Sequence, residues 1–115
     1  MERRVGPALR AIVEAIDGIE AACAGKTLED FAADWLLRHA VQRGIEIISE
    51  AARRIPVDLR AGSPDVPWPE ILGIGNVLRH EYHRISDRVI WNVVQVHLAP
   101  LTSAVLAIQA ELDES

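Results

Sequence analysis

The residues best suited to chemistry in this 115-residue chain are gathered in residues 75–84, Gly-Asn-Val-Leu-Arg-His-Glu-Tyr-His-Arg. Asn76, Arg79 and His80 are three or four residues apart, so they share one face of a helix. A histidine there can act as a general acid or base, beside an arginine and an amide that can bind a phosphate. Tyr82 follows two residues after His80, and the two can converge only where the helix loosens, as helices do near their ends.

The same segment has a second interpretation, in which it is a solvated helix end and its histidine is structural. A metal site is not expected, because His80 and His83 are one residue too close for the His-Glu-x-x-His zinc pattern. His39 and His97 have no carboxylate–histidine constellation around them, and no Ser–His–Asp arrangement or glycine-rich phosphate loop can be recognised. We therefore predict no metal and no cofactor, and both interpretations of the segment stay open.

The charge of the chain limits how it could bind nucleic acid. The net charge is −5, which argues against a general nucleic-acid binder, since such proteins need a basic surface. Five arginine or histidine residues nevertheless fall within ten positions: Arg79, His80, His83, Arg84 and Arg88. Any contact with phosphate should be made there and should be local.

Other conspicuous residues have ordinary explanations. Glu46 and Glu50 lie on one face of a predicted helix, and a solvated face is the default. Glu50 could instead reach the arginine–histidine cluster and orient it. Trp35, Trp68 and Trp91 are predicted to anchor either the core or a dimer interface, because large aromatic rings dominate such surfaces.

The elements that position these residues are helices. Apolar residues recur every three or four positions from Val5 to Cys23, which predicts an amphipathic helix that Gly25 ends. Thr27 is a good N-cap for the next helix, with Asp30 as its capping-box partner.

The second helix is predicted over residues 28–54, with an apolar stripe that changes phase and therefore faces two partners. Pro56 ends it, and residues 56–67 form a loop. A third helix is predicted from Pro67 or Pro69.

A fourth helix is predicted over residues 88–97, capped by Ser86 or Asp87, and Pro100 is predicted to open a fifth. No segment alternates with period two for long enough to form a strand. The prediction is one all-α domain over residues 1–115, an antiparallel bundle of four to five helices.

The remaining features suggest a cytoplasmic protein. Cys23 is the only cysteine, so no internal disulfide forms, which suits a reducing compartment. Met1 is followed by charged residues, and no secretory signal is visible. The most apolar stretch, residues 89–112, is broken by Asn92, Gln95, His97 and Pro100, which argues against a membrane span. Because a core this small is adequate but not generous, association with a second copy is expected to help.

The order of these motifs resembles the HepT-like branch of the HEPN superfamily over nearly the full chain. The similar segments are Phe31 and Asp34, Ile47-Ile48-Ser49-Glu50-Ala51 (similar to the family's Ile-Ile-Gly-Glu-Ala), Val66-Pro67-Trp68, His80-Glu81-Tyr82, Ile85, Val89-Ile90-Trp91 and Pro100-Leu101. The match is specific as an ensemble.

The resemblance implies a HEPN-like homodimer that acts as a metal-independent ribonuclease toxin. In that family an arginine is followed four to six residues later by His-x-Tyr, and RNA is cleaved through attack by its own 2′-hydroxyl. The partner is a minimal nucleotidyltransferase (MntA-like) antitoxin, which transfers AMP to the tyrosine. By position, the acid–base role falls on His80 and the AMP-accepting role on Tyr82.

The chain departs from the family at the arginine. Gly73, Ile74 and Gly75 occupy the positions where the arginine should stand, and the nearest arginine is Arg79. Either Arg79 substitutes from one helical turn away, or the chain keeps the fold with weak or no nuclease activity.

Two functions follow. The first is an RNase using His80 and Arg79, supported by Asn76, Glu50, His83 and Arg84. The second is a non-catalytic helical partner or substrate-binding subunit of the nucleotidyltransferase.

Overall fold

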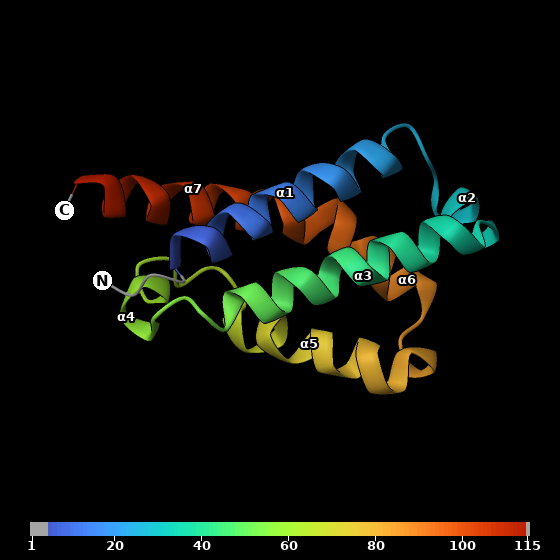
Figure 1. Cartoon of the computed structure of the whole chain (residues 1–115). Helices are drawn as coiled ribbons and strands as arrows, with labels where there is room; N and C mark the ends of the chain where they lie inside the picture. The colour runs from blue at the N-terminus through green and yellow to red at the C-terminus, as the bar shows by residue number, and fades with distance from the viewer. Residues whose placement is uncertain (1–4, 115) are drawn as a thin grey trace.

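The computed structural model describes residues 5–114, which contain helices and turns but no strand (Figure 1). The long helical segments are α1 (Val5–Cys23), α3 (Trp35–Ala52), α5 (Trp68–Glu81) and a run from residue 87 to residue 114. Figure 1 shows them running alternately in opposite directions, with α3 between α1 and α5. The predicted all-α class is confirmed.

The core lies where α1, α3 and the C-terminal run meet. On α1 the buried side chains have the predicted helical spacing: Val5, Leu9, Ile12, Ile16, Ile19 and Cys23. The buried side chains of α3 include Val41, Ile45, Ile48 and Ala52. Burying a valine, leucine or isoleucine side chain stabilises a fold by about 1.5–3 kcal/mol, so these stripes fix how the helices pack. Burial also raises the pKa of the Cys23 thiol.

The turn after α1 contains the glycine and the N-cap that the sequence predicted. Gly25 has φ 74°, a left-handed conformation that glycine adopts without steric cost. Thr27 caps α2 (Leu28–Ala33) by accepting a hydrogen bond from the Asp30 N–H at 3.1 Å. The Thr27 N–H donates in return to the Asp30 carboxylate at 2.9 Å, and these bonds hold the pKa of Asp30 below its usual value.

The prediction of one helix over residues 28–54 is wrong. The chain breaks at Asp34, whose φ and ψ are −108° and 100°, and its carboxylate accepts a hydrogen bond from the Leu37 N–H at 3.0 Å to begin α3. The break lets the fully buried Phe31 on α2 enter the core independently of α3. It also accounts for the change of phase in the apolar stripe, because two helices need not share one face. α3 then ends at Ala52.

The predicted loop at 56–67 contains one short helix, α4 (Val57–Arg60), that sequence reasoning missed. Trp68 closes this region from the first position of α5. Its indole Nε1–H donates to the carbonyl oxygens of Arg60 at 3.0 Å and Ser63 at 3.1 Å, and its ring is buried. The predicted core role of this tryptophan is confirmed.

The predicted fourth and fifth helices form one continuous run, so the prediction that Pro100 opens a new helix is wrong. Ser86 caps α6 (Asp87–Asn92) as predicted, and α6 continues through η2 (Val93–His97) into α7 (Leu98–Glu114). η2 is a π-helical turn immediately before the proline turn. Proline lacks an N–H and collides with the carbonyl four residues earlier, and a widened turn is a common way for a helix to accommodate it.

Within the described residues, Asp87–Asp113 is long and apolar enough to cross a membrane by length and composition alone. This is weak evidence, because a core helix meets the same criteria. One face of the helix is buried in the bundle through Ile90, Val94, Leu98 and Val105, and 33% of its most apolar window is buried.

Candidate functional site

The end of α5 presents the three polar residues that were predicted to share a face. Gly75 and Leu78 are buried against the bundle, and Asn76, Arg79 and His80 are exposed. None of the described residues forms a hydrogen bond or ion pair with the His80 ring. The histidine is therefore accessible to a ligand from solvent.

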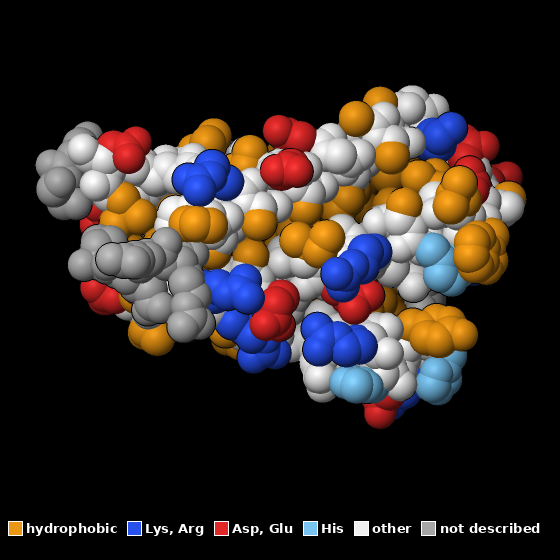
Figure 2. Space-filling view, in the orientation of Figure 1, with side chains coloured by type: hydrophobic (Ala, Val, Ile, Leu, Met, Phe, Trp, Pro, Cys, Tyr) orange, Lys and Arg blue, Asp and Glu red, His pale blue; other side chains and the backbone are white. Residues whose placement is uncertain are grey.

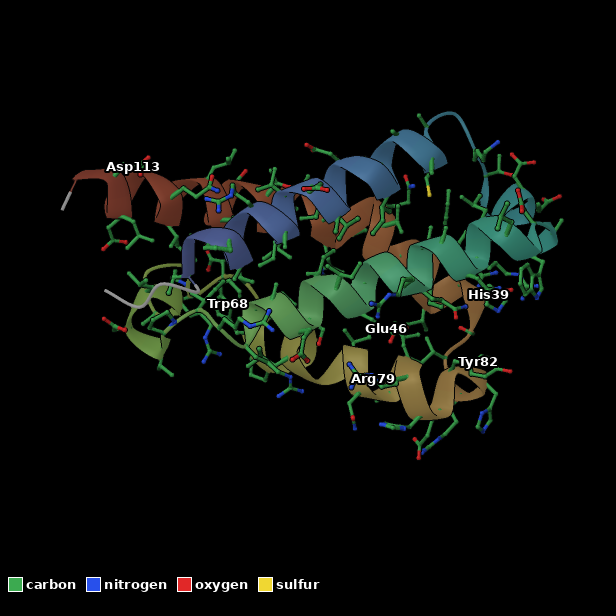
Figure 3. All side chains as sticks on the ribbon, viewed as in Figure 1. His39, Glu46, Trp68, Arg79, Tyr82 and Asp113 are labelled. Carbon is green, nitrogen blue, oxygen red and sulfur yellow. The ribbon has the colours of Figure 1, made fainter. Side chains whose placement is uncertain are left out.

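Arg79 is held against α3 by two carboxylates. Its Nε lies 3.7 Å from Oε1 of Glu46, and its Nη2 lies 3.9 Å from Oε2 of Glu50. Figure 3 shows Glu46 on α3 and Arg79 on α5 facing each other across the boundary between the two helices. The Arg79 side chain is 49% exposed, so part of the guanidinium still faces solvent.

These contacts belong to a row of alternating charges, which we call the charge row: Arg43, Glu46, Arg79, Glu50 and Arg53. Arg43 Nη1 lies 3.8 Å from Glu46, and Arg53 Nε lies 3.9 Å from Glu50. Figure 2 shows the alternation of basic and acidic side chains over the α3–α5 boundary. Ion pairs of this length and exposure contribute only about 0–1 kcal/mol each, so the row positions side chains more than it stabilises the fold.

A small recess of about 130 Å³ opens beside the charge row. It is lined by Glu46, Ser49, Glu50, Arg53, Gly75, Asn76 and Arg79. The structure thus brings Asn76, Arg79 and Glu50 together, as the sequence suggested. Glu46 was expected on a solvated face and is instead only 17% exposed. Its spacing of four residues from Glu50 was the signal that could have identified it.

Gly75 has no room for a side chain. A Cβ added there would lie 2.6 Å from both Cβ and Oγ of Ser49 on α3. Ser49 also bridges the helices: its hydroxyl donates to the Leu72 carbonyl at 3.1 Å and accepts from the Gly75 N–H at 3.2 Å. Ser49, in the segment similar to the family's Ile-Ile-Gly-Glu-Ala, and Gly75, one of the three positions where the resemblance places an arginine, are therefore in direct contact. Gly73, by contrast, faces open space.

The α-helical conformation ends just after His80. α5 gives way to the 3₁₀ turn η1 (Tyr82–Arg84), so the helix does loosen at the tyrosine. Tyr82 is 56% exposed and meets the ring of His83 edge-on, with centroids 6.0 Å apart. Arg84 donates a hydrogen bond to Glu81 at 2.7 Å. Neither His83 nor Arg84 contacts the charge row, so the structure does not bring them to Arg79.

The other two tryptophans occupy different environments. Trp91 is half-buried and packs on Phe31, with ring centroids 5.3 Å apart. Trp35 is 63% exposed and lies outside the core. It stacks on His39 at 4.1 Å, and Nδ1 of His39 donates to the Trp35 carbonyl at 2.7 Å. The core role predicted for Trp35 is wrong, and its interface role stays a prediction.

No group of three or more histidine, cysteine, aspartate or glutamate side chains that could hold a metal ion occurs in residues 5–114.

Comparison with known families assigns the chain. The model of the family described as "Ribonuclease HepT-like" matches residues 12–108. The chain belongs to the HepT-like ribonuclease family.

Relatives of known name support this membership. "Probable ribonuclease HepT" from Thermococcus cleftensis is 36% identical over 101 residues, covering 88% of this chain and 92% of that protein. "Putative RNase" from Caldanaerobacter subterraneus subsp. tengcongensis is 33% identical over 99 residues, covering 86% of this chain and 88% of that protein.

A third relative is larger. "Gamma-glutamylcyclotransferase and putative RNase" from Methanocaldococcus jannaschii is 33% identical over 115 residues, covering the whole of this chain and 52% of that protein. The chain thus spans about half of that relative's length. No solved structure matches the chain.

Ser49 on α3 leaves no room for a side chain at Gly75, and Arg79 lies one turn further along α5. Membership of a ribonuclease family implies RNA as the class of substrate.

Proposed function

We propose that this protein is a metal-independent endoribonuclease in which His80 is the general acid or base and Arg79 stabilises charge on the phosphate. The observation that carries the proposal is that Arg79, next to the accessible His80, is held by Glu46 and Glu50 while its side chain stays 49% exposed. The exposed part of a guanidinium can donate charge-assisted N–H bonds to phosphate oxygens.

The reaction needs no water and no metal. The RNA 2′-oxygen attacks the adjacent phosphorus, a 2′-O–P bond forms, and the P–O5′ bond breaks. The proton leaves the 2′-hydroxyl and a proton reaches the 5′-oxygen, and His80 serves one or both transfers. The products are a 2′,3′-cyclic phosphate and a 5′-hydroxyl.

Supporting roles follow from position. Asn76 lines the recess with Arg79 and can donate its amide to a phosphate oxygen. Glu50 orients Arg79. His83 and Arg84 are exposed near the site and are proposed to contact flanking phosphates.

The test is cleavage of single-stranded RNA by the purified protein in EDTA. His80→Ala should lower the rate by roughly a hundredfold or more, the usual range for losing a positioned acid–base group. His97→Ala, which removes an exposed histidine from η2, is the matched control and should keep the wild-type rate. Arg79→Ala should also lower the rate, and Arg79→Lys should restore only part of it, because an ammonium cannot grip two oxygens. A requirement for Mg²⁺, or full activity in His80→Ala, would refute this mechanism.

We further propose that the protein is the cytoplasmic toxin of a toxin–antitoxin pair, neutralised by a minimal nucleotidyltransferase that transfers AMP to Tyr82. The tyrosine oxygen attacks the α-phosphorus of ATP and pyrophosphate leaves. The adduct adds a negative phosphate and a bulky base, both of which oppose RNA binding. Tyr82 is the one tyrosine of the sequence and is well exposed. Mass spectrometry after incubation with ATP and the transferase should place the adduct on Tyr82, and an adduct on another residue would overturn the assignment.

A homodimer is proposed as the functional form. Its support is the exposed Trp35, and an apolar hollow of about 360 Å³ between α1 and α3 lined by small residues such as Gly18 and Gly44. The apolar faces of the two copies should pack together with the two His80 segments near each other. An obligate interface buries upwards of ~2,000 Å² in total. A stable monomer at micromolar concentration in sedimentation would exclude it.

One observation favours the second function, a non-catalytic partner of the nucleotidyltransferase. Ser49 leaves no room for a side chain at Gly75, one of the positions where the resemblance places the arginine, and Arg79 is already paired with carboxylates. AMP transfer to Tyr82 without any RNA cleavage by the unmodified protein would select this alternative.

A further inference from the structure

Glu46 is the least exposed carboxylate of the charge row. Its side chain is 17% exposed, compared with 51% for Glu50. Salt screens exposed charges more strongly than partly buried ones. Of the two carboxylates near Arg79, Glu46 therefore has the stronger hold on the guanidinium.

Glu46 also stands where α3 and α5 approach each other closely. Its backbone carbonyl lies 3.6 Å from the position of a Cβ at Gly75. Ser49, one turn further along α3, hydrogen-bonds across the same boundary. A carboxylate fixed to this part of α3 has a defined position relative to α5.

We propose that Glu46 is a positioning residue that holds the Nε side of the Arg79 guanidinium and thereby leaves its exposed part available to the substrate phosphate. The arginine side chain is long and flexible and loses rotamer entropy when it is fixed in one place. If the Arg79 side chain is already restricted before substrate binds, the guanidinium is in place and no further rotamer entropy is lost during the reaction. The catalytic part of this inference rests on the proposed ribonuclease function, and the ordering of Arg79 does not.

A purely stabilising role accounts less well for the geometry. The pairs of Glu46 with Arg79 and Arg43, at 3.7 and 3.8 Å, are longer than hydrogen bonds. Desolvating a carboxylate is costly, and pairs of this length and exposure return little. These contacts therefore serve mainly to fix the position of the Arg79 guanidinium.

The first test follows the Nε–Hε signal of Arg79 by NMR in the full chain, assigned by its loss in Arg79→Lys. In the wild type the heteronuclear NOE should show an ordered Nε–H. In Glu46→Gln it should fall toward the value of a free arginine side chain. Glu111→Gln, which removes one exposed negative charge from α7, should leave the signal unchanged. An Nε–H that is equally ordered, or equally mobile, in wild type and Glu46→Gln overturns the proposal whether or not the protein cleaves RNA.

The second test uses cleavage kinetics. Glu46→Gln should lower kcat roughly tenfold to a hundredfold, the scale of misplacing a catalytic group. It should also lower KM, because one negative charge near the RNA is gone, whereas a general loss of structure would weaken RNA binding and would not lower KM. Arg79→Lys should cost less in Glu46→Gln than in wild type, because the geometry that it disrupts is already lost. Full kcat in Glu46→Gln, with Arg79→Ala still impaired, would show that Arg79 acts without Glu46.

Discussion

The close contact between Gly75 and Ser49 gives a stability prediction that does not depend on function. A Cβ introduced by Gly75→Ala would lie 2.6 Å from Cβ and Oγ of Ser49, and the next nearest atom, the Glu46 carbonyl oxygen, lies at an ordinary 3.6 Å. Only Ser49 therefore obstructs the substitution. Gly73→Ala is the matched control on the same helix, because a Cβ there meets nothing within 4 Å.

Two effects decide the magnitude. Replacing glycine by alanine inside a helix gains about 1 kcal/mol, and overpacking a tight contact costs about 1–3 kcal/mol. Gly73→Ala should therefore stabilise the protein by about 1 kcal/mol. Gly75→Ala should be about 1–3 kcal/mol worse than Gly73→Ala. In a Ser49→Gly background the obstruction is gone, and Gly75→Ala should then gain about 1 kcal/mol as well.

The assay is urea unfolding followed by circular dichroism at one fixed protein concentration, since association would make stability concentration-dependent. The four variants of the Ser49–Gly75 cycle should give a coupling energy of about 1–3 kcal/mol, and the lost hydrogen bonds of Ser49 cancel in the cycle. Equal effects of Gly75→Ala in both backgrounds, or equal effects of Gly75→Ala and Gly73→Ala, would refute the steric argument.

Four further predictions concern the fold. Thr27→Ala should destabilise the protein by about 1 kcal/mol in urea unfolding, because α2 loses its N-cap. The folded pKa of Asp30 is depressed, so its capping contribution should be complete above the unfolded pKa near 3.8 and fade as pH falls through the folded pKa; Asp30→Asn should flatten that part of the stability–pH curve. Cys23 is 4% exposed with a raised thiol pKa, so iodoacetamide should label it slowly at pH 7–8 and quickly in denaturant. Trp68→Phe should cost about 1–3 kcal/mol, because two carbonyls lose their indole donor; unchanged stability would mean that water replaces it.

The pattern of the candidate site could be predicted in part. Spacing along one helix identified Asn76, Arg79 and His80, because residues three and four apart share a face whatever the helix packs against. The approach of Glu50 to Arg79 was weighed as one of two outcomes, since a contact between helices depends on their rotation and register. The participation of Glu46 was missed for the same reason, as its default environment was solvent.

Sequence by itself determined the helical class, the α1 stripe and the cap at Thr27, and it limited the cap of α6 to Ser86 or Asp87, since these features depend on contacts within about one turn of the chain. It did not determine the break at Asp34 or the continuity of the helix through Pro100. A residue with cap chemistry inside a helical pattern, or a proline near a predicted helix start, is compatible with either outcome until the neighbouring helices are in place. Only the tertiary structure decided whether a side chain fits at position 75. Ser49 and Gly75 are 26 residues apart in sequence and meet because α3 and α5 pack closely, and this contact excludes a side chain at position 75.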